Sequence, residues 1–274
     1  MVTDYPGTIG LRFNFINGGT SGLMSNVKIR KAISYSIDRE EMIDAVYGRY
    51  NPAYSYVAPA ITFNGSSYRS QVGEVIEDEY NEYVGDPDKI VALFQEGLDE
   101  LGVETPIEDI TLTYLTSGST TEVQAEREYI QQSLEETLGL TVELSVAGDT
   151  SLFIADRNEG NYDFFLGGWY SDYNDPLDFL YTNYTDAYGM SFGGYSNTDY
   201  DALADQLVGE TDMDKRLDIY KQMEQILLLD DCAFAPIYYA TKQVLLQNWV
   251  KDYRTSSFGA SAEFIWTYID GKNQ

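Results

Sequence analysis

The residue types that could carry acid–base or nucleophilic chemistry are restricted in this sequence. It has 45 Asp and Glu residues, no His and a single Cys, Cys232. Without His there is no Ser-His-Asp triad, no Cys-His pair and no His-containing zinc site, and one Cys cannot form an internal disulfide. Catalysis would therefore rest on carboxylates, Tyr, Lys or hydroxyl groups. A glycosidase that uses two carboxylates stays open as an alternative, although no local motif marks an acid/base pair.

Aromatic, acidic and amide side chains are concentrated in residues 168–176, Gly-Trp-Tyr-Ser-Asp-Tyr-Asn-Asp-Pro. The spacing of Asp172, Asn174 and Asp175 superficially suggests a calcium loop, but the D-x-N-x-D-G pattern is absent, so neither a metal nor a cofactor is predicted. Asp175 and Pro176 fit the cap and first turn of a short helix. Taken alone, Asp172 fits a turn-capping residue and Trp169 fits either the core or a site.

The composition restricts the partners of the protein. Seventeen Lys and Arg against 45 Asp and Glu give a formal net charge of −28. Such a negative field repels nucleic acids and anionic lipid surfaces, so no nucleic-acid partner is expected. No stretch approaches 18 uninterrupted apolar residues. Because 43% of the residues are hydrophobic and 14% are aromatic, the chain can still bury a large core, and a globular fold is expected.

The spacing of apolar residues predicts an alternation of strands and helices. Strands are expected over residues 9–16, 111–115, 141–146, 162–168, 235–239 and 243–246. Helices are expected over residues 26–47, 88–101, 121–138, 150–158, 199–208 and 212–229. The strand–helix–strand run from 111 to 146 is a crossover unit, which predicts parallel strands. Residues 51–75 and 169–197 are expected to be loops with short structured pieces.

Several segments, in this order along the chain, resemble the extracytoplasmic solute-binding proteins of ABC importers, in their oligopeptide-binding class. Residues 26–40 are similar to the family's helix "vRqAlsyAiDre", and residues 162–163 with 168–176 resemble its "yD…gW..Dy.dP" segment. Residues 217–239 resemble its "R..ly..ae.il..d.p.iPly" region. The resemblance implies an α/β fold, namely one lobe of a type II periplasmic-binding-protein-like fold with a mixed sheet flanked by helices.

Members of this class are usually longer than this chain and have two lobes that close on the ligand, so the resemblance covers only their second half. It implies a hinge-proximal lead-in at residues 1–8 and a ligand-binding lobe two at residues 9–243. Residues 244–274 would be a C-terminal return segment that packs on the missing N-terminal lobe one. The resemblance also implies an extracytoplasmic lipoprotein anchored at the cell surface, with its export signal and anchor cysteine upstream of Met1.

The function implied by the resemblance is capture rather than catalysis. Such a protein binds short peptides outside the cell and delivers them to an ABC permease in the membrane. Within the same family, a nickel chelate, a sugar or a cell-wall peptide stays open as the cargo. The absence of any basic residue just before Trp169 means that no preference for acidic side chains is predicted.

The resemblance assigns Asp172 to the ammonium group of the peptide, because a buried ammonium needs a carboxylate partner. Gly168, Trp169 and Tyr170 are expected to offer a strand edge to the peptide backbone, with Gly168 leaving room for its close approach. Trp169 and Tyr173 are expected to wall side-chain pockets. Asn174 is a further candidate for ligand contact.

Three sequence features outside residues 168–176 have a structural or chance interpretation as well as a functional one. Thr116 and Ser117, at a strand end before a helix, could meet a ligand carboxylate, but a helix-capping loop is the favoured interpretation of residues 116–121. Cys232 is interpreted as a small core residue. The glycosylation sequon at residues 183–185 is interpreted as chance.

Overall fold

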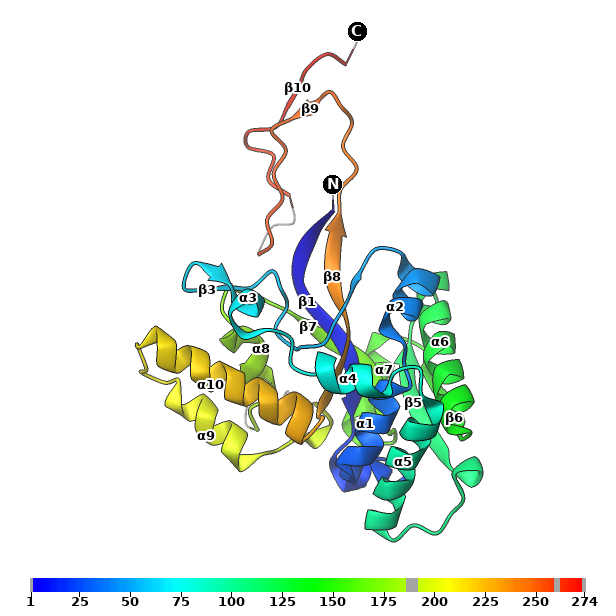
Figure 1. The fold of residues 1–274 in the computed structure, drawn as a ribbon. Coiled ribbons are helices and arrows are strands. Elements are labelled where there is room, and N and C mark those ends of the chain that lie inside the picture. Colours follow the sequence, from blue (N-terminus) through cyan, green and yellow to red (C-terminus); the bar gives the residue numbers. More distant parts are fainter. Residues whose placement is uncertain (1, 186–191, 259–261, 273–274) are drawn as a thin grey trace.

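The computed structural model describes residues 2–185, 192–258 and 262–272. Its centre is a six-stranded sheet in the order β2-β8-β1-β7-β5-β6 (Figure 1). The central strand β1 pairs antiparallel with β7 and β8, whereas β5 runs parallel to both β6 and β7. The sheet is therefore mixed, as predicted. Its strands are β1 (Val2–Phe13), β2 (Asn51–Pro52), β5 (Thr111–Ser117), β6 (Thr141–Ala147), β7 (Phe164–Tyr170) and β8 (Phe234–Gln243).

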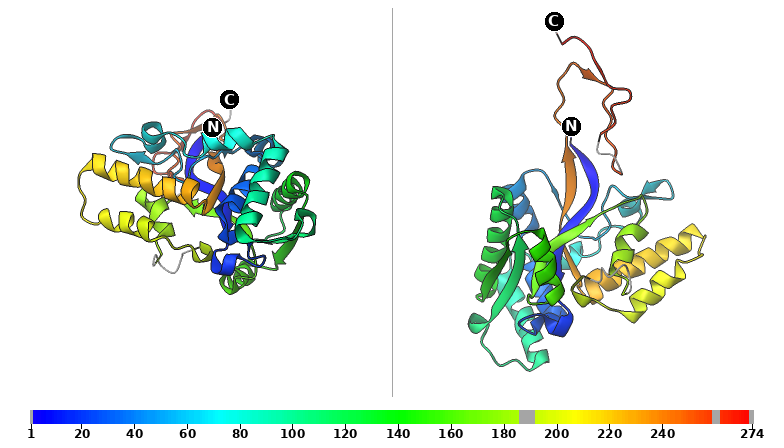
Figure 2. Two further views of the ribbon diagram at one scale, coloured as in Figure 1. Left: turned by 60° about the horizontal axis from the view of Figure 1, so that its bottom comes forward. Right: turned by 180° about the vertical axis from the view of Figure 1, so that it is seen from behind.

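Helices cover both faces of this sheet (Figure 2). Successive residues of β8 point to opposite faces, and Phe234 and Ala235 accordingly belong to two different apolar clusters. One cluster packs α1, α5 and α6 on the sheet, and the other packs α8, α9 and α10. The helices are α1 (Val27–Tyr35), α2 (Arg39–Met42), α3 (Tyr68–Val72), α4 (Glu77–Tyr83), α5 (Pro87–Leu101), α6 (Thr121–Leu138), α7 (Thr150–Glu159), α8 (Leu177–Leu180), α9 (Thr198–Gln206) and α10 (Met213–Gln225).

Shorter elements fill the connections, including two small hairpins. β3 (Thr62–Phe63) pairs with β4 (Ser66–Ser67), and β9 (Val250–Lys251) pairs with β10 (Tyr268–Ile269). Single helical turns occur at Ile16–Gly18, Leu23–Ser25, Ile43–Tyr47, Ile107–Asp109, Tyr181–Asn183, Phe192–Gly194 and Ile226–Asp230.

Most predicted helices are confirmed with their caps. The Thr120 side chain accepts from the Val123 amide at the start of α6, and Gly139 ends this helix in the left-handed conformation. The helix predicted over residues 26–47 is instead broken after Tyr35. Asp38 caps a new helix, α2, by accepting from the Glu41 amide. The break turns the buried Arg39 inward, where it donates to the carbonyls of Ala53 and Pro236.

Several predicted boundaries are wrong because strand partners extend or shift the elements. The strand predicted from residue 9 begins at Val2, which pairs with Gln243, so residues 2–8 are part of β1. The position of this lead-in next to a hinge stays a prediction. The strands predicted over 235–239 and 243–246 are the single strand β8, and Leu245 beyond it is 98% exposed.

The strand predicted over residues 162–168 is also displaced, to Phe164–Tyr170. Asp163 anchors the turn before it by accepting from the Ser21 and Thr113 amides. α4 is not among the predicted elements. Within the segment 169–197, α8 is the expected short helix, and residues 186–191 lie outside the described residues.

Glycines allow β1 to approach its two neighbours at backbone contact distance. A Cβ on Gly10 would lie 2.2 Å from the Ala235 carbonyl oxygen of β8. A Cβ on Gly168 of β7 would lie 1.9 Å from the Thr8 carbonyl oxygen of β1. Side chains are thus excluded at both positions by the neighbouring backbone.

After Gln243 the chain leaves the sheet, and the β9–β10 hairpin projects away from the rest of the molecule (Figure 1). Phe264, Ile265 and Trp266 in this segment are 66%, 83% and 61% exposed. The packing of residues 244–274 on a further lobe remains a prediction.

Substitution at Gly10 tests the backbone contact. We expect Gly10→Ala to lower the free energy of unfolding by about 1–3 kcal/mol, because β1 and β8 must separate to admit the methyl group. Gly148→Ala is the control, since its Cβ would meet only Leu152, at 3.4 Å. Urea unfolding monitored by circular dichroism measures both variants. Equal stability of the two variants would contradict the close approach.

Candidate functional site

Beyond Phe165, one edge of strand β7 has no partner strand in the described part of the chain. β1 pairs with it from Phe164 to Tyr170, but β5 pairs with it only at Phe164 and Phe165. The Ser171 amide donates to the Pro6 carbonyl at 2.8 Å, so the backbone of Ser171 faces β1. By the alternation of a strand, Gly168 and Tyr170 direct their N–H and C=O groups to the open edge.

The backbone of Gly168 faces the open edge of β7. The reason why this position excludes a side chain differs from the predicted one. The expected reason was close approach of a ligand backbone. In the structure a Cβ at this position would collide with the Thr8 carbonyl oxygen and with Ile9, both on β1. Glycine is therefore required by the neighbouring strand, whether or not a ligand is bound.

One buried carboxylate organises the turn after β7. The Oδ2 atom of Asp178 accepts from Trp169 Nε1, Ser171 Oγ and the Asp172 amide, each at 2.8 Å. Asp178 itself is 8% exposed. Three donors compensate the cost of burying its charge, and they fix the backbone between the end of β7 and α8.

The Asp172 carboxylate is exposed at the end of this turn. Its backbone amide is held by Asp178, but no hydrogen bond or ion pair of its side chain occurs among the described residues. A carboxylate that is positioned by its backbone and left without a cation can bind a cationic group of a ligand. The turn-capping interpretation fails for Asp172 and fits Asp178 instead.

Three aromatic residues lie close to Asp172 in the sequence, namely Trp169, Tyr170 and Tyr173. Trp169 is half-buried and packs against the cluster of α8–α10, so it belongs to the core as well as to the site. Tyr170 and Tyr173 are 48% and 49% exposed. The structure thus brings together an open strand edge, an exposed carboxylate and aromatic walls, which is an arrangement suited to an extended chain bearing a positive charge.

Comparison with known proteins identifies the family. Residues 2–191 match the family described as bacterial extracellular solute-binding proteins, family 5, middle region. The chain belongs to this family. The resemblance noted in the sequence is confirmed.

Two curated relatives of this family 5 protein have peptide-binding names. The dipeptide-binding protein DppE of Bacillus subtilis (strain 168) is 30% identical over 249 residues, which are 90% of this chain and 42% of DppE. The oligopeptide-binding protein OppA of the same strain is 30% identical over 234 residues, 84% of this chain and 39% of OppA. The chain therefore spans less than half the length of these relatives.

Solved structures confirm the predicted fold class. OppA of Listeria monocytogenes bound to peptide matches with a TM-score of 0.78 at 30% identity, over 98% of this chain and 50% of that one. The substrate-binding domain of an oligopeptide ABC transporter from Bacillus anthracis matches with a TM-score of 0.82 at 24% identity, over the same shares of the two chains. No helix within the described residues is long and apolar enough to cross a membrane.

The other residues singled out in the sequence of the family 5 chain have different surroundings from Asp172. The Asn174 amide is engaged by Thr62, whose N–H and hydroxyl lie 2.8 and 2.5 Å away, so it pins the β3–β4 hairpin. Thr116 is 7% exposed and lies with Ser117 just beyond the point where β5 separates from β7. Asp175 accepts from the Leu177 amide, as its predicted capping role requires.

Two further residues singled out in the sequence are buried, and the core position predicted for Cys232 is confirmed. Cys232 is 3% exposed, and burial raises the pKa of its thiol to about 11. Asn183 of the sequon is 4% exposed and accepts from Arg12, so the folded chain does not present it for glycosylation.

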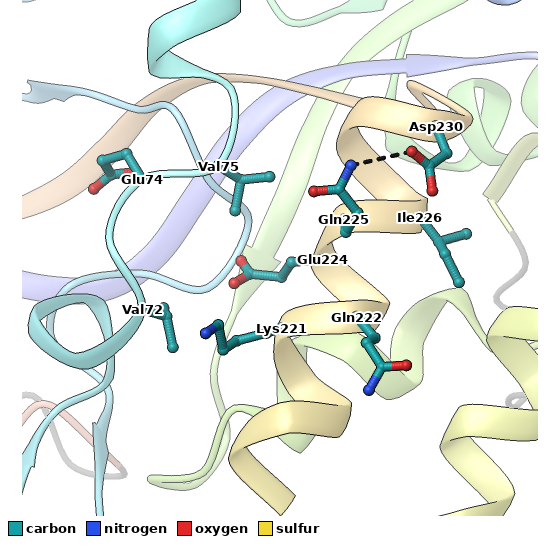
Figure 3. A pocket seen from close by; sticks show the side chains of 9 residues that line it. All are labelled: Val72, Glu74, Val75, Lys221, Gln222, Glu224, Gln225, Ile226 and Asp230. Atoms are coloured by element: carbon teal, nitrogen blue, oxygen red, sulfur yellow. Dashed lines mark hydrogen bonds between the residues drawn. The ribbon is translucent and has the colours of Figure 1, made fainter.

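A cavity of about 530 Å³ lies away from β7, between residues 72–75 and α10 (Figure 3). Glu224 points into it, but this carboxylate is already satisfied. It pairs with Arg69 and accepts from the Tyr56 and Val57 amides and the Tyr68 hydroxyl. The buried charge in this cavity is compensated within the protein, and no predicted site residue lines it.

Asp178 is the residue that sequence reasoning missed. It lies inside α8, six residues after Asp172, where nothing local distinguishes it from an exposed helical Asp. The only available signal is its place after the Gly-Trp-Tyr-Ser-Asp-Tyr segment, whose donors need an acceptor once the segment folds.

We expect Asp178→Ala to loosen this turn. The loss of the shared acceptor should lower the free energy of unfolding by about 1–3 kcal/mol and speed amide hydrogen exchange in residues 169–173. Asp172→Ala is the matched control, because its carboxylate has no partner in the described residues. Unchanged exchange in Asp178→Ala would contradict the positioning role.

Glu126 makes the stability of the folded chain depend on pH. This carboxyl on α6 accepts from the Tyr47 hydroxyl, and burial raises its pKa from 4.5 to about 7. The folded state therefore binds the proton more tightly than the unfolded chain, and the stability that depends on this proton is lost as pH rises from about 4.5 to about 7.

We expect Glu126→Gln to raise the melting temperature at pH 8 and to change it little at pH 5, because the amide is neutral at both. Glu128→Gln, at an exposed position on the same helix, is the control. Differential scanning calorimetry measures the shifts. An equal shift at both pH values would contradict the assignment.

Proposed function

We propose that this chain is the second lobe of a substrate-binding protein that captures oligopeptides outside the cell for an ABC permease. The open edge of β7 beside the exposed Asp172 carboxylate is the observation that carries the proposal. A peptide added as a strand pairs its backbone with Gly168 and Tyr170, which gives affinity without a requirement for particular side chains. The peptide-binding names of DppE and OppA support the same cargo.

In this proposal Asp172 receives the α-amino group of the peptide. The turn held by Asp178 places the carboxylate beyond the end of β7, so a peptide paired with this strand ends near it. Trp169 and Tyr173 supply side-chain walls. The chain binds and releases its cargo unchanged and is not an enzyme.

The rest of the receptor is a lobe one outside this chain. Support comes from the pairing of Val2 with Gln243, which sets the start of β1 beside the end of β8. Two chain segments that pass side by side from one lobe to the other would form a hinge for closure around a ligand. The exposed rings of Phe264 and Trp266 would pack on lobe one, which removes apolar surface from water. An export signal and a lipid anchor would lie upstream.

Calorimetry on the full-length protein that contains this chain tests the proposal, with tetra-alanine as the ligand. We expect binding by the wild type and a loss of affinity of roughly tenfold to a hundredfold in Asp172→Asn, as for removal of a hydrogen bond to a charged group. N-acetylated tetra-alanine is the control ligand, because it lacks the ammonium and should bind both proteins equally weakly.

Absence of heat with tetra-alanine and with mixed tri- to pentapeptides would contradict peptide capture. Equal affinity of wild type and Asp172→Asn for the free-amino peptide would contradict the role of Asp172 alone.

A further inference from the structure

The cavity between residues 72–75 and α10 is large enough for a ligand of its own. Its volume of about 530 Å³ falls within the roughly 300–1,000 Å³ of sites that hold a whole small molecule. None of the residues assigned to the peptide lines it, so a ligand here would not compete with a peptide at β7. Its lining consists of Val72, Glu74, Val75, Lys221, Gln222, Glu224, Gln225, Ile226 and Asp230.

The wall formed by residues 72–75 is held in place by the rest of the fold. The Val75 amide donates to Ser55 Oγ at 2.9 Å. The Tyr239 hydroxyl of β8 donates to Glu74 at 2.6 Å. A ligand therefore meets a wall that is already ordered and loses little free energy to ordering it.

The opposite wall, α10, continues into a widened helical turn. The Asp231 amide donates to the Ile226 carbonyl at 2.9 Å, five residues back instead of the four of an α-helix. Widened turns of this kind are frequent at functional sites. Asp230 in this turn lines the cavity at the opposite end of the helix from Lys221 (Figure 3).

Three charged side chains of the cavity have no partner of opposite charge among the described residues. Lys221 makes no hydrogen bond or ion pair there. Glu74 accepts only from the neutral Tyr239 hydroxyl. Asp230 accepts only from the neutral Gln225 amide, at 3.1 Å. The cavity thus presents one ammonium and two carboxylates to a ligand, which favours a molecule with one carboxylate and two cationic groups.

The arrangement of these three groups restricts the shape of the ligand. Lys221 and Glu74 lie on one side of the cavity and Asp230 on the other, with the apolar Val75 between them (Figure 3). The helix rises by roughly 12 Å from Lys221 to Asp230. An ammonium and a carboxylate on one carbon atom cannot reach both ends. The ligand therefore needs these two groups at one end, an apolar stem, and its second cation at the far end.

We propose that this cavity binds a free basic amino acid, such as arginine. Lys221 receives its α-carboxylate, Glu74 its α-ammonium and Asp230 its side-chain cation. This site is additional to peptide capture and does not depend on it.

Calorimetry on the full-length protein tests this inference, with L-arginine titrated in the presence and absence of excess tetra-alanine. Three analogues each lack one charge: citrulline the side-chain cation, agmatine the carboxylate and Nα-acetylarginine the ammonium. We expect arginine to bind with the same Kd in both titrations. Each analogue should bind at least tenfold more weakly, because it leaves one charged group of the cavity without its partner.

Two variants locate the contacts. In Asp230→Asn, the preference for arginine over citrulline should fall close to one while the preference over agmatine persists, and Lys221→Gln should do the reverse. Both side chains are exposed, so neither substitution removes a core contact. Asp218→Asn is the matched control, because it removes an exposed carboxylate of α10 that does not line the cavity. It should keep both preferences.

The outcomes distinguish this inference from the proposed function. Absence of heat with arginine, equal affinity for arginine and citrulline, or preferences that survive in both variants would overturn the inference. Displacement of arginine by tetra-alanine would also overturn it, since arginine would then occupy the peptide site. Failure of peptides to bind would contradict the proposed function alone, because arginine binding and its two preferences decide the inference.

Discussion

The fold depends on the close approach of the central strand β1 to the strands on both of its sides. Gly10 and Gly168 allow this approach, because any side chain there would meet a neighbouring carbonyl oxygen. Among the described strands, only β1 pairs with β7 beyond Phe165, since β5 has separated by that point. The edge of β7 beyond Phe165 is open because β5 separates from it there, while β1 keeps the strand in the sheet.

Compensation of buried charge distinguishes structural carboxylates from the candidate functional one. Asp178 and Glu224 are buried, and each accepts hydrogen bonds from several donors of its own chain. Asp172 is exposed and its carboxylate has no partner among the described residues. In a chain with 45 acidic residues, composition cannot make this distinction. It follows from the cost of desolvating a charge, which only a folded environment can reveal.

The two ends of the described fold have a common explanation. β1 and β8 pair up to Val2 and Gln243, after which the chain continues into a segment with exposed rings. A lobe that lacks its partner would leave such a surface uncovered, and the chain spans less than half the length of DppE and OppA.

The sequence by itself determined the family and the α/β class. It also determined most helices, because capping residues such as Asn26 and Thr120 act locally. It also marked residues 168–173 as the candidate site. Tertiary structure decided which of these residues have partners within the chain: Asp172 is exposed, Asp178 accepts from the Asp172 amide, and Asn174 is hydrogen-bonded to Thr62. It also showed that the neighbouring strand β1 excludes a side chain at Gly168. Local propensity fixes where a helix begins, but the choice between a ligand and a structural partner depends on residues far away in the chain.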